Sequence, residues 1–133
     1  MGLDMYAYAV SAEYADDCQH DIRLWEDEQI EPIEAAQADT QFAYWRKFYQ
    51  LHRWMEELYY QKGGEDEFFN CRTVRLELED LDRLECALGT PEFASLGSCG
   101  EPDPEGLEYT KEFIRRSREA IDGGQAVFYD SWW

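Results

Sequence analysis

Residues 42–62, FAYWRKFYQLHRWMEELYYQK, have the strongest helical pattern in the chain. Its apolar side chains recur every three or four residues, which is the spacing of one face of an α-helix. This face consists of Tyr44, Phe48, Leu51, Met55 and Leu58. A neighbouring stripe consists of Trp45, Tyr49, His52 and Tyr59. Because Gly63-Gly64 ends the pattern, the segment predicts one long amphipathic helix over 42–62.

The flanking segments predict three strands and two further helices. Residues 3–10, 68–76 and 125–133 alternate or are rich in aromatic residues, as strands are. Leucines at helical spacing predict a short helix from Leu78 to Leu88, and a third helix follows Asp103-Pro104. The order of elements predicts an α+β fold, with a small, mostly antiparallel sheet and two or three helices packed on one face.

The composition indicates one folded domain. Of the 133 residues, 44% are hydrophobic and 16% aromatic, so we expect residues 1–133 to form a single domain with its own core. No apolar run approaches the roughly 20 residues of a membrane-spanning helix. The N-terminus lacks the basic and apolar regions of a secretory signal. We therefore expect a cytoplasmic protein with no membrane partner.

The cysteines do not predict a metal site. Cys18, Cys71, Cys86 and Cys99 include no Cys-x-x-Cys pair, which is typical of free thiols in a reducing compartment. Cys18-Gln19-His20 brings two zinc-ligand types together, but adjacent side chains rarely converge on one ion without further ligands. We expect no metal, no cofactor and no catalytic residue.

The charge is the strongest functional signal. The chain has a net charge of −18, which disfavours direct binding to nucleic acid. Half of this excess lies in an acidic excursion over residues 11–40, where ten acidic residues face one Arg23. The second irregular segment is a Pro/Gly-rich loop over 91–106. The predicted partner-binding residues are Glu13, Asp16, Asp17, Asp21, Glu26, Asp27, Glu28, Glu31 and Glu34.

Two motifs and the closing aromatic strand carry a resemblance. The chain begins Met1-Gly2-Leu3-Asp4-Met5-Tyr6 and contains Tyr44-Trp45-Arg46-Lys47 followed by Leu51-His52-Arg53-Trp54. In these features it resembles a family of small bacteriophage and prophage proteins. It departs from that family over 11–40 and 91–106. The resemblance implies a phage or mobile-element origin, with the protein acting in the cytoplasm of a bacterial host, and supplies no established chemistry.

Charge and resemblance together favour a protein-binding function. Carboxylates fixed on a folded surface can occupy a cleft built for DNA phosphates, which carry one charge per ~1.7 Å of duplex axis. Such a DNA mimic would inhibit a basic nucleic-acid-binding host protein, in the manner of anti-CRISPR or anti-restriction proteins. The sequence does not predict an oligomeric state.

Two alternatives stay open at this point. Trp45, Arg46, Tyr49 and His52 form a possible pocket for an anionic or planar ligand, around which a small-ligand or metal-dependent enzyme could be built. The acidity could instead be an adaptation to high salt, which nine Arg against three Lys would allow.

Overall fold

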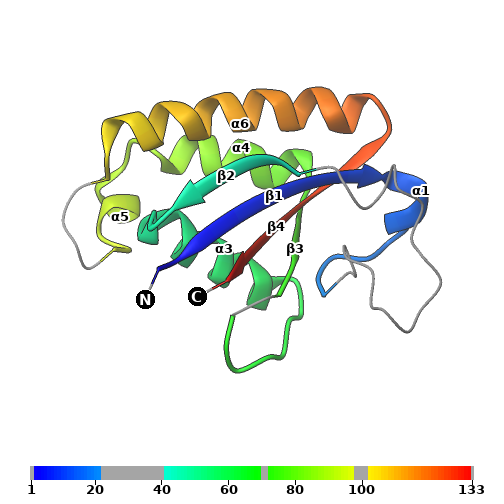
Figure 1. Cartoon of the computed structure of the whole chain (residues 1–133), viewed down its shortest axis with the longest axis horizontal. Helices are drawn as coiled ribbons and strands as arrows, with labels where there is room; N and C mark the ends of the chain where they lie inside the picture. The colour runs from blue at the N-terminus through cyan, green and yellow to red at the C-terminus, as the bar shows by residue number, and fades with distance from the viewer. Residues whose placement is uncertain (1, 22–40, 70–71, 98–101, 133) are drawn as a thin grey trace.

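The computed structural model describes residues 2–21, 41–69, 72–97 and 102–132. Its centre is an antiparallel four-stranded sheet with the strand order β2-β1-β4-β3 (Figure 1). The strands are β1 (Asp4–Ser11), β2 (Gln41–Arg46), β3 (Val74–Leu76) and β4 (Gln125–Trp132). The first and last strands of the chain therefore pair at the centre of the sheet.

Within the described residues, three helices pack on one face of this sheet, which confirms the predicted α+β class (Figure 1). They are α3 (Tyr49–Gln61), α4 (Leu78–Ala87) and α6 (Pro104–Asp122). Two single-turn helices, α1 (Ala12–Ala15) and α5 (Pro91–Ala94), lie in connections. Asp103 begins α6 because its carboxylate accepts a hydrogen bond from the Glu105 amide, and Pro104 occupies the first turn.

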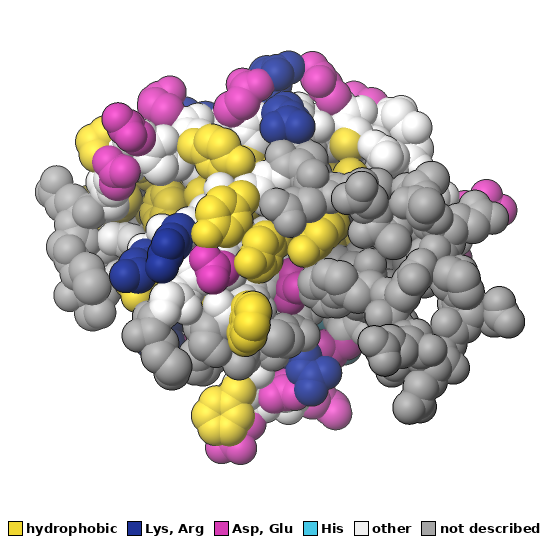
Figure 2. Space-filling view, viewed as in Figure 1, with side chains coloured by type: hydrophobic (Ala, Val, Ile, Leu, Met, Phe, Trp, Pro, Cys, Tyr) yellow, Lys and Arg dark blue, Asp and Glu magenta, His cyan; other side chains and the backbone are white. Residues whose placement is uncertain are grey.

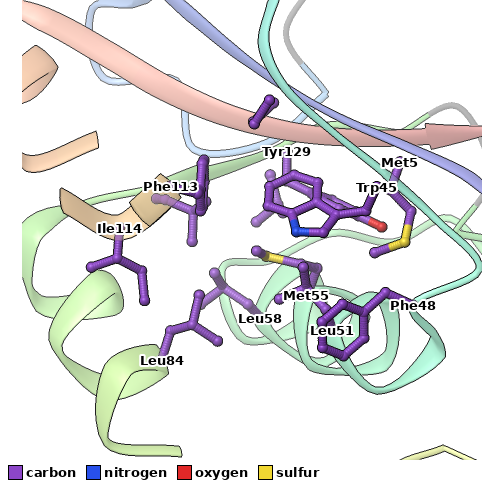
Figure 3. Close-up of a cluster of buried hydrophobic side chains, with 14 of the residues drawn as sticks. Met5, Trp45, Phe48, Leu51, Met55, Leu58, Leu84, Phe113, Ile114 and Tyr129 are labelled. Atoms are coloured by element: carbon purple, nitrogen blue, oxygen red, sulfur yellow. The ribbon is translucent and has the colours of Figure 1, made fainter. Parts of the chain in front are cut away.

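The main core lies between the sheet and these helices (Figure 3). Alternate strand residues such as Met5, Trp45 and Tyr129 face the helices, because side chains in a strand point to opposite faces in turn. The helices contribute one apolar stripe each. These stripes include Leu51, Met55 and Leu58 of α3, Leu84 of α4, and Phe113 and Ile114 of α6.

The prediction of one helix over 42–62 is wrong in its first part. Residues 41–46 form β2 and pair with β1, with Trp45 opposite Met5 and Tyr44 opposite Tyr6. Ala43 and Trp45 are buried while Tyr44 is 41% exposed, which is the alternation of a strand. Lys47 has a φ of +57°, in the left-handed region, and there the chain turns from β2 into α3.

The other predicted elements are confirmed with shorter or shifted bounds. The strand predicted over 68–76 is reduced to β3 in the described residues. The loop predicted over 91–106 contains α5, and α6 begins inside it at Pro104. Within the excursion predicted over 11–40, residues 11–21 include α1, and residues 22–40 lie outside the described residues.

The opposite face of the sheet, which we call the aromatic face, has a smaller apolar cluster. The cluster is formed by Tyr8, Val10, Ala15, Ala126 and Phe128, with Tyr6 packed against it. The guanidinium of Arg75 lies 5.9 Å from the centre of the Phe128 ring, within cation–π range. Trp132 belongs to this face and is 65% exposed.

Candidate functional site

The predicted acidic site falls partly outside the described residues. Glu13, Asp16, Asp17 and Asp21 lie inside them. The remaining predicted carboxylates, Glu26, Asp27, Glu28, Glu31 and Glu34, lie outside. The described part of this surface therefore consists of α1 and the segment that follows it.

Three of these carboxylates gather around α1. Ser11 ends β1 and begins α1, because its hydroxyl oxygen accepts a hydrogen bond from the Glu13 amide at 3.2 Å. Glu13, Asp16 and Asp17 are all exposed, and none forms an ion pair with another described residue. Among the residues that the structure describes, these three negative charges therefore have no counter-ion.

Asp21 has a different environment from the α1 carboxylates. Its Oδ2 accepts a hydrogen bond from the Tyr59 hydroxyl at 2.9 Å and lies 2.9 Å from the His20 Nδ1. Arg72 approaches its other oxygen at 3.8 Å. Asp21 therefore attaches this segment to α3, and the structure does not group it with Glu13, Asp16 and Asp17.

Several acidic residues of α4 and α6 are paired with arginines. Arg118 binds Asp82 at 2.6 Å and Glu85 at 3.0 Å, which joins the two helices. On α6, Arg115 binds Glu112 and Glu119. The hydrogen bond from Arg115 lowers the pKa of the Glu112 carboxyl. This helical surface is therefore mixed in charge, unlike the surface around α1.

A buried carboxylate lies on the aromatic face of the sheet. Asp130 is 2% exposed, lies opposite Tyr6 in the β1–β4 pair, and its Oδ1 has no hydrogen-bond partner among the described residues. Burial raises the pKa of Asp130 to about 7, because a charged carboxylate loses its hydration there. Sequence reasoning missed this residue, since its period-2 position shows nothing of how deeply it is covered.

Three of the four residues of the predicted ligand pocket line one cavity of the structure. A pocket of about 480 Å³ lies between the C-terminal end of β2, the start of α3 and the first turns of α6. We call it the β2–α6 pocket. Trp45, Arg46 and Tyr49 line it, together with residues that the sequence reasoning did not assign. The added residues include Tyr44, Lys47, Asp103, Glu105 and Tyr109.

Trp45 is held in the pocket wall by α6. Its indole N–H donates to the Thr110 hydroxyl at 3.0 Å, and that hydroxyl donates to the Gly106 carbonyl at 2.7 Å. The Trp45 ring also contacts the Phe113 ring edge-on, with centroids 4.8 Å apart. Because Trp45 is 4% exposed, it supports the pocket and offers little free ring surface to a ligand.

His52 does not line the β2–α6 pocket. It lies on α3 with its Nδ1 2.7 Å from the Tyr129 hydroxyl oxygen and its ring packed against Phe69. Burial, with a smaller contribution from Arg53, lowers the pKa of His52 to about 4. His52 is therefore neutral at pH 7, and the structure separates it from Trp45, Arg46 and Tyr49.

No metal site occurs among the described residues. No group of three or more His, Cys, Asp or Glu side chains is placed there to hold an ion. The Cys18 thiol donates to the His20 carbonyl at 3.1 Å, so these two side chains do not converge. Within the same residues, no helix combines the length and apolar character needed to cross a bilayer.

The missed pocket residues come from a distant segment. Tyr109 accepts a hydrogen bond from the Tyr44 amide at 3.0 Å, across 65 positions of sequence. No local periodicity predicts a contact between residues so far apart. Of the missed residues, Lys47 could have been found, because it belongs to the Tyr44-Trp45-Arg46-Lys47 motif.

Comparison with protein-family models, curated proteins and solved structures finds no match to this chain.

Proposed function

We propose that this chain is a non-enzymatic protein-binding protein whose carboxylates bind a basic, nucleic-acid-binding protein. The observation that carries the proposal is the contrast between its acidic surfaces. Glu13, Asp16 and Asp17 have no counter-ion among the described residues. On α4 and α6, by contrast, Arg118 pairs with Asp82 and Glu85, and Arg115 pairs with Glu112 and Glu119. Unpaired surface charge attracts and orients a partner of opposite sign.

The physical basis of binding is substitution for phosphates. A cleft that holds DNA presents Lys and Arg at the spacing of the phosphate backbone, and fixed carboxylates satisfy the same cations. The net charge of −18 supplies the long-range attraction. More specifically, we propose that the protein is a DNA mimic of the anti-CRISPR or anti-restriction type.

The aromatic face adds contact area to this proposal. Figure 2 shows hydrophobic side chains gathered over the strands of this face, with acidic side chains among them. Tyr44 and Trp132 are 41% and 65% exposed, and the Tyr44 hydroxyl donates to Asp4 at 2.6 Å. Tyr and Trp are enriched where proteins meet, because their rings bury a large area and keep a polar tip.

The test is capture of a basic nucleic-acid-binding protein from bacterial lysate, followed by competition with duplex DNA. We expect the captured protein to bind DNA and this chain in mutually exclusive complexes. Because the contact is electrostatic, its affinity should fall steeply between 50 and 200 mM salt, as roughly expected for several ion pairs.

A matched pair of variants assigns the contact to the α1 carboxylates. Glu13→Gln, Asp16→Asn and Asp17→Asn together remove three charges and should weaken binding. The control removes three paired charges of α6, through the changes Glu108→Gln, Glu112→Gln and Glu119→Gln, and should change binding less. Equal loss in both variants, or simultaneous binding of DNA and this chain, would contradict the proposal.

A further inference from the structure

The β2–α6 pocket holds charges of both signs that do not neutralise one another. Arg46 and Lys47 lie on its β2 side, and Asp103 and Glu105 lie at the start of α6. We propose that this pocket binds a small zwitterion with an aromatic body, of the class of a free aromatic amino acid. The proposal is independent of the protein-binding function and needs no residue of α1.

The basic side of the pocket is unusual in this chain. Most described Lys and Arg side chains lie within 4.0 Å of a carboxylate. Arg46 and Lys47 are exposed and have no such partner among the described residues, despite the net charge of −18. Figure 2 shows basic side chains side by side near the C-terminal end of β2. Two unpaired cations in one wall suit a ligand carboxylate.

The acidic side of the pocket faces the same space. Asp103 begins α6, and one of its carboxylate oxygens accepts the Glu105 amide hydrogen at 3.3 Å. Both side chains are exposed, and neither forms an ion pair with Arg46, Lys47 or another described residue. Two carboxylates without a cation suit a ligand ammonium group.

Aromatic rings also line the pocket. Tyr44, Tyr49 and Tyr109 are each between 37% and 41% exposed. The Tyr109 hydroxyl is fixed by the Tyr44 amide, and its ring packs edge-on against Trp45 with centroids 5.6 Å apart. Rings held in this way lose little entropy when a ligand ring stacks on them.

A glycine allows the two sides of the pocket to approach. A Cβ at Gly106 would lie 2.9 Å from the Phe48 ring, closer than real Cβ atoms approach. The first turn of α6 can therefore lie against the β2–α3 connection only because position 106 has no side chain. This approach brings Asp103 and Glu105 to the same pocket as Arg46 and Lys47.

The combination of charges decides between ligand classes. A purely anionic ligand would be repelled by Asp103 and Glu105. A purely cationic ligand would be repelled by Arg46 and Lys47. A zwitterion matches both sides and brings no net charge into the pocket. A volume of about 480 Å³ accommodates an amino acid with an aromatic side chain.

The test uses the full chain and isothermal titration calorimetry with L-phenylalanine. Two blocked compounds are the arms of the experiment: L-phenylalanine amide lacks the carboxylate, and N-acetyl-L-phenylalanine lacks the ammonium group. We expect L-phenylalanine to bind and each blocked compound to bind about tenfold more weakly, because each loses a charge-assisted contact. Absence of L-phenylalanine binding, or equal binding of either blocked compound, would overturn the proposal.

Variants place the binding in this pocket. Lys47→Asn removes the cation with a residue that accepts a φ of +57°, and Arg46→Gln removes its neighbour. The double variant should bind L-phenylalanine about tenfold more weakly. The control Arg53→Gln removes an exposed α3 cation outside the pocket and should bind normally. Unchanged binding by the double variant would reject the pocket as the site.

Discussion

Asp80 at the start of α4 and Asp130 in β4 are both 2% exposed, yet their surroundings differ. Asp80 lies 2.6 Å from the Lys62 ammonium and 3.0 Å from the Arg83 guanidinium, and it accepts the Glu77 amide hydrogen at 3.0 Å. Asp130 has an oxygen without a partner in the described part of the chain. Burial alone therefore does not define a carboxylate's role, since Asp80 pairs with two cations and Asp130 keeps one oxygen without a partner among the described residues.

The two aspartates contribute differently to the stability of the folded state. A buried charge with partners on several sides holds elements together, here α3, α4 and the β3 end of the sheet through Lys62. A buried carboxylate with an unsatisfied oxygen destabilises the folded state unless it is protonated. The following substitutions test this distinction.

The largest effect is expected for Asp80→Asn. The amide oxygen can still accept the Glu77 amide hydrogen, but the Lys62 ammonium loses its carboxylate in a site where only 13% of its side chain is exposed. Removing one member of a buried pair costs roughly 3 to 5 kcal/mol. Urea unfolding at pH 7 measures this loss, and a loss under 1 kcal/mol would show that the pair is not part of the framework.

Asp130→Asn should raise the free energy of unfolding at neutral pH, whereas Asp80→Asn lowers it. The pKa of about 7 in the folded state lies above that of the unfolded chain, so the wild-type protein loses stability as pH rises toward 7. Between pH 5 and pH 8 the loss is about 3 kcal/mol. The asparagine variant lacks this carboxyl, so its stability relative to wild type should increase by that amount over the same interval.

Measurements at the two pH values separate charge from packing in the Asp130 variant. A packing defect would lower stability equally at pH 5 and pH 8. If the variant is no more stable than wild type at pH 8, the Asp130 carboxylate has favourable partners in the folded state, which would contradict the prediction.

His52 tests the effect of burial on a base, whose pKa is lowered and not raised when its charged form loses hydration. Its pKa of about 4 in the folded state lies below the ordinary 6.5, so stability is lost as pH falls below 6.5. Between pH 7 and pH 5 the loss is about 2 kcal/mol. His52→Gln can keep a hydrogen bond to Tyr129 and should remove this part of the pH dependence. An unchanged slope of stability against pH would exclude His52 as its source.

The smallest effect is expected for Arg83→Gln. Arg83 binds Asp80 at 3.0 Å, but 54% of its side chain is exposed and the Lys62 contact persists. Exposed ion pairs contribute between about 0 and 1 kcal/mol. Thermal unfolding of this variant beside Asp80→Asn shows which partner of Asp80 matters, and equal losses would contradict the ranking.

The predictions from sequence succeeded where neighbouring residues carry the signal. Strands β1 and β4 and helices α4 and α6 follow from alternation, leucine spacing and the Asp103-Pro104 start. The prediction failed over residues 41–46, where one set of aromatic residues fits both a helical and an alternating pattern. Pairing with β1 decided the outcome there, because it buries Trp45 and Ala43 against the helices.

The residues of the candidate pocket could likewise be predicted only where they are neighbours in the sequence. Trp45, Arg46 and Tyr49 could be proposed from one motif, but Asp103, Glu105 and Tyr109 reach the pocket from α6. His52 was grouped with Trp45 only because a continuous helix was expected. Once the chain turns at Lys47, His52 faces Tyr129 and leaves the group.

The helical and strand segments named above, the excess of negative charge and its concentration before residue 41 all follow from the amino-acid sequence alone. These properties depend on neighbouring residues and on composition. Three other properties require the folded chain: which carboxylates have counter-ions, how deeply Asp130 is buried, and which charges share the β2–α6 pocket. The physical reason is that solvation and ion pairing depend on groups that are distant in sequence and are brought together only by the packing of the sheet and helices.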